Sequence, residues 1–145
     1  MKPVVIDASV IWKWHFPEPN TDDCLGVLNM PCELHAPRVA MDQIGLGLAK
    51  RVRRKELEVD QATRILANIR RLPIIWTPTT VLAENALEIS TLSSRGFVDC
   101  LHVALAIQHQ TWAVTGDRRW FAFVNTGFFR NHVMWVGDFV KPVRK

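Results

Sequence analysis

The sequence predicts a three-layer α/β/α fold, in which helices cover both faces of a mainly parallel sheet. Short β-branched and apolar runs typical of buried strands recur along the chain, and longer segments with apolar residues at helical spacings separate them. Strands joined by helices run parallel to one another, because the chain must cross back over the sheet between them. A length of 145 residues, 48% of them hydrophobic, suits one domain with a substantial core. We therefore expect a single domain over residues 1–145.

The N-terminal half contains two predicted strands and two predicted helices. Pro3 to Ile6 is a β-branched run typical of a buried strand, and Leu34 to Ala36 is a weaker strand candidate. Apolar residues recur three or four positions apart over Val39 to Arg54 and again over Val59 to Arg71. That spacing predicts two amphipathic helices in succession.

The C-terminal half repeats the alternation. Ile74 to Trp76 is a weak strand candidate, and helical spacing predicts helices over Thr80 to Leu92 and Val98 to His109. The apolar stretch Trp112 to Val114 predicts a further buried strand, and His132 to Val136 is a weaker candidate near the end of the chain. Strands and helices thus alternate along most of the sequence.

Charge, hydrophobic stretches and the cysteine and histidine spacing exclude several classes of protein. The formal net charge of +4 favours a polyanionic partner without requiring one. No apolar stretch reaches the roughly 18 residues of a spanning helix, and an acidic residue stands where a signal peptide would be apolar, so we expect a cytoplasmic protein without membrane contact. The three cysteines, Cys24, Cys32 and Cys100, form no C-x-x-C pair, and the histidines lack zinc-site spacing. Neither a disulfide framework nor a zinc site is expected.

Three aspartates are candidates for one site. Asp7 and Asp117 follow predicted strands, and the carboxyl ends of parallel strands collect at one edge of a sheet. Asp99 lies at the start of the apolar helix FVDCLHVALAI, where it could face the same edge. Gathered carboxylates repel one another, and a hard cation such as Mg²⁺ or Mn²⁺ relieves that repulsion. Taken singly, the three also fit a turn, a helix start and an N-cap, and that structural interpretation stays open.

Three blocks of sequence carry a family resemblance. They are VVIDASVIWKWHFPEP, APRVAMDQIGLGLAKRVRRKEL, and FVDCLHVALAIQHQTWAVTGD followed by RRW. In order and approximate spacing they resemble the PIN-domain ribonucleases of the VapC toxin type. The most specific parts are D-A-S-V after the first strand, V-D-x-L-x-x-A-L-A in a helix, and T-x-D after a short apolar strand. The resemblance spans nearly the whole chain and implies a PIN-like fold.

The resemblance also implies a function and a set of site residues. It implies a Mg²⁺- or Mn²⁺-dependent endoribonuclease that is the toxin of a toxin–antitoxin pair, with RNA as substrate, an antitoxin protein as partner and a homodimer as assembly. Asp7, Asp99 and Asp117 match the family's acidic catalytic and metal-binding positions. Ser9 and Thr115 match positions that support the site. His102 stands where the family often has an aromatic residue, and we expect it to be structural.

One position departs from the family pattern. The helix after the second strand usually carries a Glu six residues past a Pro, and counting from Pro37 gives Gln43. Counting back from Glu56-Leu57 gives the same residue, and the usual Asn three positions on is Leu46. Asp42 is adjacent, but one residue turns a helical side chain by about 100°. Either Gln43 or a shifted Asp42 would complete the metal site, and we favour Gln43.

Basic residues are the candidates for RNA contacts. Arg118 and Arg119 directly follow Asp117, so we expect one of them to reach substrate phosphate. A second group at a predicted helix end is Lys50, Arg51, Arg53 and Arg54. For this group a solvated helix terminus is an equal alternative. Tryptophans near the acids, such as Trp12 and Trp120, could stack on bases, although core packing is the commoner role.

Two other functions compete with the nuclease. A PIN-like module that has lost catalysis and binds RNA or protein fits Gln43 and Leu46. A phosphotransferase with an Asp nucleophile would fit a strand that ends at Asp7, but such enzymes carry a second acid two residues later, where this chain has Ser9. Metal-dependent cleavage of RNA separates the nuclease from the binding module.

Overall fold

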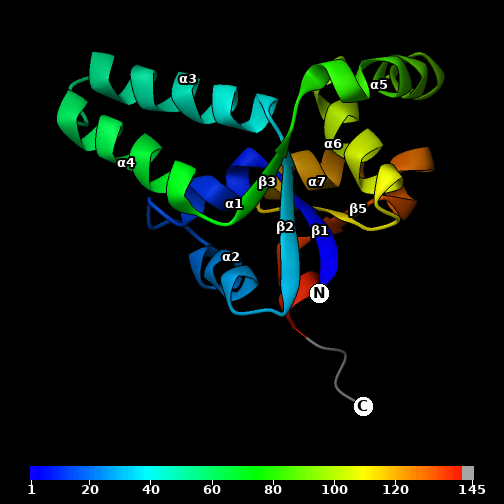
Figure 1. The fold of residues 1–145 in the computed structure, drawn as a ribbon, viewed down its shortest axis with the longest axis horizontal. Helices are drawn as coiled ribbons and strands as arrows, with labels where there is room; N and C mark the ends of the chain where they lie inside the picture. The colour runs from blue at the N-terminus through cyan, green and yellow to red at the C-terminus, as the bar shows by residue number, and fades with distance from the viewer. Residues whose placement is uncertain (142–145) are drawn as a thin grey trace.

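The fold is built on a five-stranded sheet. The computed structural model describes residues 1–141 and is shown in Figure 1. Its strands are Lys2–Ile6 (β1), Cys32–Pro37 (β2), Ile74–Thr77 (β3), Ala113–Thr115 (β4) and Val133–Trp135 (β5). They lie in the order β3-β2-β1-β4-β5, and every neighbouring pair is parallel. The parallel sheet and its flanking helices confirm the predicted three-layer α/β/α class.

Residues 1–141 also form eight α-helices and one 3₁₀ helix, of which all but the last α-helix lie between strands. The longer ones are Thr21–Leu28 (α2), Val39–Arg53 (α3), Val59–Arg71 (α4), Thr79–Ser93 (α5) and Phe97–Gln108 (α6). The shorter ones are Ala8–Lys13 (α1), Arg118–Val124 (α7), Gly127–Asn131 (η1) and Val136–Val140 (α8). The four predicted helices thus correspond to α3, α4, α5 and α6. The short helices were not predicted, because such a helix spans too few turns to show a periodic pattern, and the eight-residue α2 was not predicted either.

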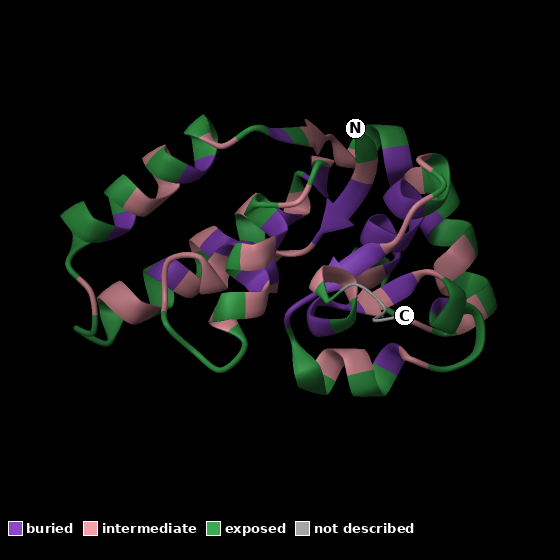
Figure 2. Cartoon of the chain, turned by 90° about the horizontal axis from the view of Figure 1, so that it is seen from below, coloured by how far each residue is buried: buried purple, intermediate pink, exposed green. Residues whose placement is uncertain are grey.

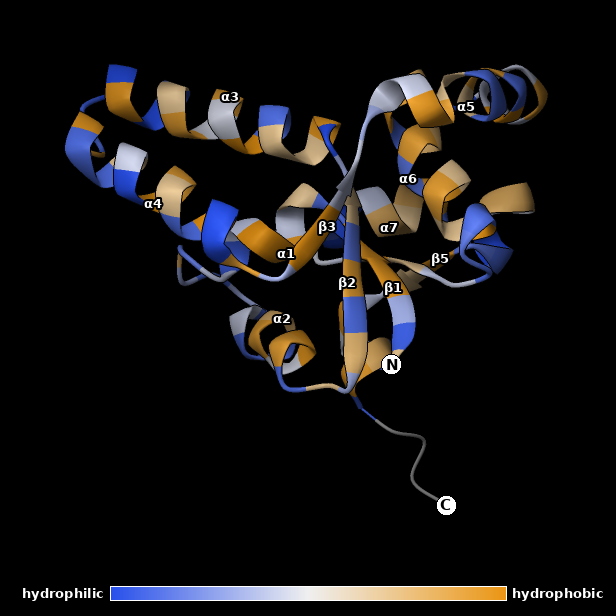
Figure 3. Ribbon diagram, in the orientation of Figure 1, coloured by the Kyte–Doolittle hydropathy of each residue, from blue (hydrophilic) through white to orange (hydrophobic). Residues whose placement is uncertain are grey.

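Alternate residues of β1 supply two separate cores, one on each face of the sheet. Val4 and Ile6 belong to a cluster shared with α1, α2, α3, α4 and α8. Val5 belongs to a second cluster, which is formed mainly by α5 and α6. Figure 2 shows the buried residues concentrated in the centre of the molecule, and Figure 3 shows that α6 is largely hydrophobic while α3 and α4 mix both characters. This alternation follows from the two-residue period of a strand.

The strand order determines where a ligand can bind. β1 lies at the centre of the sheet, with β2 on one side and β4 on the other. The chain leaves β1 towards β2 over one face and reaches β4 over the other, through α5 and α6. The crevice at the carboxyl ends of β1 and β4 is therefore a topological switch point, which is the usual binding position in open α/β sheets. β3 and β5 are the edge strands.

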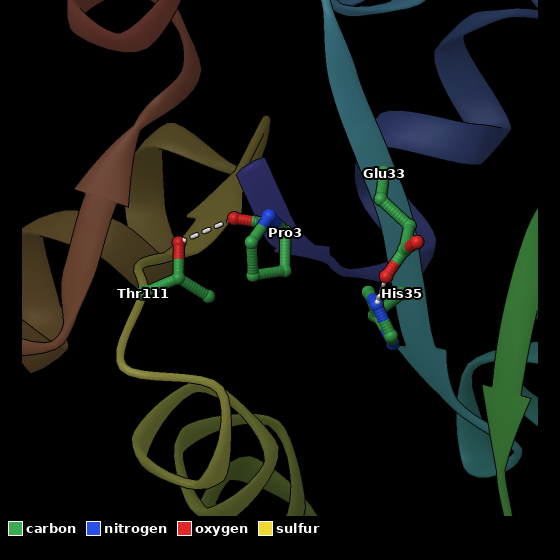
Figure 4. Close-up of polar contacts among 4 residues, drawn as sticks. All are labelled: Pro3, Glu33, His35 and Thr111. Carbon is green, nitrogen blue, oxygen red and sulfur yellow. Dashed lines mark hydrogen bonds and ion pairs between the residues drawn. The ribbon is translucent and has the colours of Figure 1, made fainter. Parts of the chain in front are cut away.

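Two polar contacts lie away from the carboxyl ends of the strands: one joins β1 to the turn before β4, and the other lies within β2. The Thr111 hydroxyl, in the turn before β4, donates a hydrogen bond of 2.7 Å to the carbonyl oxygen of Pro3 in β1 (Figure 4). On β2 the buried His35 places its Nε2 2.6 Å from Oε1 of Glu33.

No helix within residues 1–141 is long and apolar enough to cross a membrane.

Trp12 fixes α3 against α1, close to the basic end of α3. Its ring stacks on Phe16 at 4.4 Å between centroids, and its Nε1 donates to Glu18 at 3.1 Å. The Arg51 guanidinium lies 5.2 Å from the centre of the Trp12 ring and 3.9 Å from a Glu18 oxygen. With these partners around it, the Trp12 ring cannot easily shift.

We expect Gly47→Ala to lower the free energy of unfolding. A Cβ at residue 47 would lie 2.9 Å from a Trp12 ring carbon, and nothing lets that ring move away cheaply. Overpacking costs about 1–3 kcal/mol, which outweighs the gain of about 1 kcal/mol from replacing glycine within a helix. Urea unfolding of the purified protein measures the difference.

Gly45→Ala is the matched control in the same helix. No atom lies within 4 Å of the position its Cβ would take. The helix propensity of alanine should then raise the free energy of unfolding by about 0.5–1 kcal/mol. A Gly47→Ala protein as stable as the Gly45→Ala protein would show that Trp12 does not pack against α3 in this way.

Candidate functional site

The candidate site lies at the carboxyl ends of β1 and β4. β1 ends at Ile6 and Asp7 follows it directly, while β4 ends at Thr115 and Asp117 follows after Gly116. The two strands are neighbours, with Ile6 paired to Val114. Two aspartates that are 110 residues apart in the sequence are thereby brought to the same edge of the sheet.

Asp7 begins α1 as its N-cap. Its Oδ1 accepts backbone hydrogen bonds from Ser9 at 3.0 Å and Val10 at 3.2 Å, and the Ser9 hydroxyl donates to the same oxygen. These bonds satisfy the free N–H groups of the first turn and orient the carboxylate. The other carboxylate oxygen, Oδ2, makes no hydrogen bond within the described part of the chain. The capping role therefore leaves one oxygen of Asp7 available for a ligand.

Ser9 and Thr115 connect the two loops that carry Asp7 and Asp117. Ser9 Oγ accepts from the Gly116 N–H at 2.8 Å and lies 3.3 Å from Thr115 Oγ1, which accepts from the Asp117 N–H at 3.1 Å. Because the single hydroxyl proton of Ser9 goes to Asp7, the Thr115 hydroxyl is the donor between the two. This network holds the two aspartates in a fixed relation.

Gly116 is required by the close approach of these loops. A Cβ at this position would lie 3.0 Å from the Cys24 sulfur and 3.4 Å from Ser9 Oγ. Burial raises the pKa of the Cys24 thiol to about 11, so the thiol is protonated at neutral pH. The packing around Gly116 is structural, and the oxygen donors of the site come from elsewhere.

Asp117 and Asp99 complete the acidic group. Asp117 caps α7, because its Oδ1 accepts from the Trp120 N–H at 3.0 Å. Asp99 lies half-buried in the first turn of α6, and its carboxylate has no hydrogen bond to any residue in 1–141. The capping roles that sequence analysis left open for Asp7 and Asp117 are thus real, and both residues face the candidate site as well.

All three aspartates line one cavity of about 190 Å³. The other residues around it come from α1, α3, α6 and α7, and they are Ala8, Ser9, Gln43, His102 and Trp120. None of the ion pairs among residues 1–141 involves Asp7, Asp99 or Asp117. The cavity therefore concentrates negative charge that no basic side chain in this part of the chain neutralises directly.

α3 presents Gln43, and not Asp42, to the cavity. Both residues are exposed, but only Gln43 is part of the cavity lining, and Asp42 lies outside it. The helix begins at Val39, so the register matches the motif counting that placed Gln43 at the family's Glu position. A neutral amide thus occupies the position from which a fourth carboxylate would face Asp7 and Asp99.

The donor set suits a hard divalent cation. Carboxylate oxygens and an amide oxygen are the ligands that Mg²⁺ and Mn²⁺ prefer. Within residues 1–141, no three His, Cys, Asp or Glu side chains converge closely enough to enclose an ion by themselves. Mg²⁺ usually keeps several water molecules and binds one or two carboxylates directly, which this wider spacing allows.

Basic side chains lie beside the acidic cavity. An adjoining cavity of about 300 Å³ shares Ser9 and Asp117 with it and is lined as well by Lys13, Arg118 and Arg119. Lys13 donates a hydrogen bond from its Nζ to the Gly116 carbonyl oxygen. Arg118 stacks on Trp135 at 4.8 Å, and Arg119 is exposed.

The second basic group lies at the C-terminal end of α3. Lys50, Arg51 and Arg53 occupy its last turn and Arg54 follows as its cap. Arg51 is engaged by Glu18 and the aromatic rings of α1, while the other three are exposed. None of the four lines the acidic cavity. Their favourable interaction with the helix dipole explains their position without a ligand.

Sequence reasoning missed two side chains of this site. Lys13 lies on α1 one turn after Ser9, a spacing that places both on the same side of the helix, but α1 itself was not predicted. His102 was expected to be structural, and it is buried at 4% exposure, yet it also lines the acidic cavity. Its position one turn after Asp99 was the available signal.

Comparisons with known proteins agree with this architecture. A family model described as the PIN domain matches residues 4–126. The crystal structure of PAE2754 from Pyrobaculum aerophilum is similar, with a TM-score of 0.66 and 18% identity over 96% of this chain and 87% of that one. No curated protein sequence matches the chain.

Two further solved structures share the fold. VapBC2 from Rickettsia felis, bound to a DNA fragment from its promoter, gives a TM-score of 0.57 and 12% identity over 92% of this chain and 98% of that one. FitAcB from Neisseria gonorrhoeae gives a TM-score of 0.51 and 19% identity over 90% of this chain and 96% of that one.

Proposed function

The chain belongs to the PIN domain family, and from that premise we propose that it is a metal-dependent endoribonuclease, the toxin of a toxin–antitoxin pair. The observation that carries the proposal is the cavity lined together by Asp7, Asp99 and Asp117. It lies at the switch point of the sheet and lacks direct neutralisation by basic side chains of residues 1–141. Such a site is suited to a divalent cation and, through it, to a phosphodiester.

Asp7, Asp99 and Asp117 would hold Mg²⁺ or Mn²⁺, with Gln43 contributing its amide oxygen. The cation supplies charge neutralisation at the phosphoryl oxygens and acidifies water. The protein's own contribution is geometric: Ser9 and Thr115 fix the two loops, and the helix caps orient Asp7 and Asp117. Preorganised carboxylates do not have to reorganise during the reaction.

The substrate would lie across the acidic cavity and the adjoining basic one. Arg118, Arg119 and Lys13 line the adjoining cavity together with Asp117 and give it three positive charges. Phosphate contacts of this kind position a nucleic acid without reading its sequence. Lys50, Arg53 and Arg54 would extend the contact only for a longer RNA, because they lie outside both cavities.

Cleavage of single-stranded RNA by the purified protein tests the proposal. We expect products with Mn²⁺ or Mg²⁺ and none in excess EDTA, because the carboxylates alone cannot neutralise a phosphodiester. Equal cleavage in EDTA would point to a contaminant or to another mechanism. A denaturing gel of an end-labelled RNA shows the result directly.

Gln43 favours a second candidate function. With a neutral amide in the cavity, the site carries one negative charge fewer than the family pattern, which weakens metal binding and removes one proton acceptor. A PIN domain altered in this way could bind RNA or protein without cutting it. Retained RNA binding with no cleavage over a range of Mn²⁺ concentrations would favour this function.

The antitoxin and the homodimer follow from the family resemblance alone. We propose that the protein is neutralised by a small antitoxin protein and assembles as a dimer. Co-expression with the product of an adjacent small reading frame tests the first proposal, and sedimentation equilibrium of the purified protein tests the second.

A further inference from the structure

The basic cavity beside the acidic one contains an acidic side chain, Glu18, that the proposed function does not use. Glu18 lines this cavity, of about 300 Å³, together with Lys13, Arg118 and Arg119. None of the ion pairs among residues 1–141 joins Glu18 to any of these three cations. A carboxylate repels phosphate, so a cavity that held phosphate alone would gain nothing from it. Its presence indicates a ligand that carries hydrogen-bond donors as well as negative charge.

The loop between α1 and α2 holds Glu18 in a fixed position. Pro17 and Pro19 flank it, and their rings restrict the backbone on both sides. The Glu18 N–H donates to Thr21 Oγ1 at 2.8 Å, and the Glu18 carbonyl oxygen accepts from the Thr21 N–H at 3.1 Å. Its carboxylate accepts from Trp12 Nε1 at 3.1 Å. The carboxylate is therefore oriented before any ligand binds.

One oxygen of the Glu18 carboxylate stays open to a ligand. Both contacts of the side chain, the bond from Trp12 and the ion pair with Arg51 at 3.9 Å, use Oε2. Oε1 makes no hydrogen bond to any residue of 1–141, and 35% of the side chain is exposed. A carboxylate has about four lone-pair sites, so it can accept further bonds. A structural role explains Oε2 and leaves Oε1 unused.

The same cavity also offers hydrogen-bond donors. Lys13 donates from its Nζ to the Gly116 carbonyl oxygen, and an ammonium group carries further N–H donors beyond that bond. Arg119 is exposed and presents its guanidinium to the same cavity. A ligand that fits therefore carries donors for Glu18 and acceptors for the cations.

Of the RNA bases, guanine matches this combination best. Its Watson–Crick edge carries two neighbouring donors, N1–H and the N2 amino group, which one carboxylate can accept together. Its O6 and N7 are the acceptors that Arg and Lys commonly bind. Adenine and cytosine offer a carboxylate only an amino group. The N3–H of uracil lies between two carbonyl oxygens, which repel a carboxylate.

We propose that this cavity is a guanine subsite of the nuclease, in which Glu18 accepts from N1–H and the N2 amino group of the base. The inference rests on the proposed function, because it places the base of a nucleotide next to the phosphodiester at the acidic site. The two cavities share Ser9 and Asp117, so the two ligand positions are adjacent. A volume of about 300 Å³ lies at the lower end of the range of about 300–1,000 Å³ for small-molecule sites.

Cleavage of matched oligouridines tests the subsite without any variant. Each RNA is end-labelled and carries a single guanosine, inosine, adenosine or cytidine at its centre, and plain oligouridine is the reference. We expect kcat/KM for cleavage next to guanosine to exceed that of the reference about tenfold or more, the selectivity of a bidentate base contact. Inosine lacks only the N2 amino group of guanosine, so its advantage over uridine should be smaller.

Glu18→Gln should remove this preference. The amide keeps one acceptor oxygen and replaces the other with a donor, so it cannot accept both guanine donors. The guanosine-to-uridine ratio of kcat/KM should fall about tenfold, and the difference between guanosine and inosine should disappear. If Glu18 were purely structural, its substitution would lower cleavage of every RNA by the same factor. Glu84→Gln is the matched control, because Glu84 is exposed in α5 and lines neither cavity.

Several results would overturn the subsite. They are a wild type that cuts next to another base as well as next to guanosine, a Glu18→Gln protein that keeps the guanosine preference, and an equal loss of preference in Glu84→Gln. If the wild type cuts none of these RNAs, the proposed nuclease fails, and fluorescence anisotropy of the same RNAs in EDTA decides on the subsite. Tighter binding of the guanosine RNA that Glu18→Gln abolishes would support it. Equal binding of all the RNAs, or none, would contradict it.

Discussion

Asp7→Asn is expected to abolish cleavage while leaving the fold intact. Asparagine is as good an N-cap as aspartate, so the amide oxygen can still accept from Ser9 and Val10 at the start of α1. The negative charge that faces the cavity is lost, and with it an anionic ligand. Removing one preorganised electrostatic group from an active site lowers the rate on the order of 100- to 1,000-fold. Single-turnover cleavage of a labelled RNA measures this loss.

Asp60→Asn is the matched control for charge. Asp60 is also an acid in the first turn of a helix, α4, but it is exposed and does not line the cavity. Its substitution should leave both cleavage and the melting temperature close to those of the wild type. Full activity of Asp7→Asn would exclude Asp7 from the chemistry and reduce its role to that of a helix cap.

Gln43→Glu is expected to raise activity. Because Gln43 lines the cavity, the substitution adds a fourth carboxylate to Asp7, Asp99 and Asp117. An additional anionic ligand should tighten Mn²⁺ binding. Cleavage should rise about tenfold or more, since about 1.4 kcal/mol corresponds to that factor. Calorimetric titration with Mn²⁺ and cleavage at subsaturating metal measure the two effects separately.

Asp42→Asn is the comparison that tests the register of α3. Asp42 is exposed and lies outside the cavity, so its substitution should change little. If Asp42 instead held the metal, Asp42→Asn would destroy Mn²⁺ binding, and Gln43→Glu would bring no gain in affinity because of repulsion between like charges. That pair of results would contradict the placement of Gln43.

The elements of the fold could largely be predicted from the sequence because each carries a local pattern. The helix predicted at Val59 to Arg71 is observed with those bounds, and the other three differ by one residue at one end or at both. The weak strand candidates are all strands, but His132 to Val136 proved shorter, at Val133–Trp135, because the chain enters α8 at Val136. The short helices α1 and α7 lacked a readable period.

The sequence by itself also determined that Asp7 and Asp117 follow strands, and that an amide stands at residue 43, since both follow from local order along the chain. Only the tertiary structure decided that β1 and β4 are neighbours and that Gln43 shares a cavity with the aspartates. It likewise brought Lys13 beside Asp117 and placed His102 in the lining of the acidic cavity. Strand order and helix rotation depend on how apolar faces pack across long separations in sequence, and no local pattern records that packing.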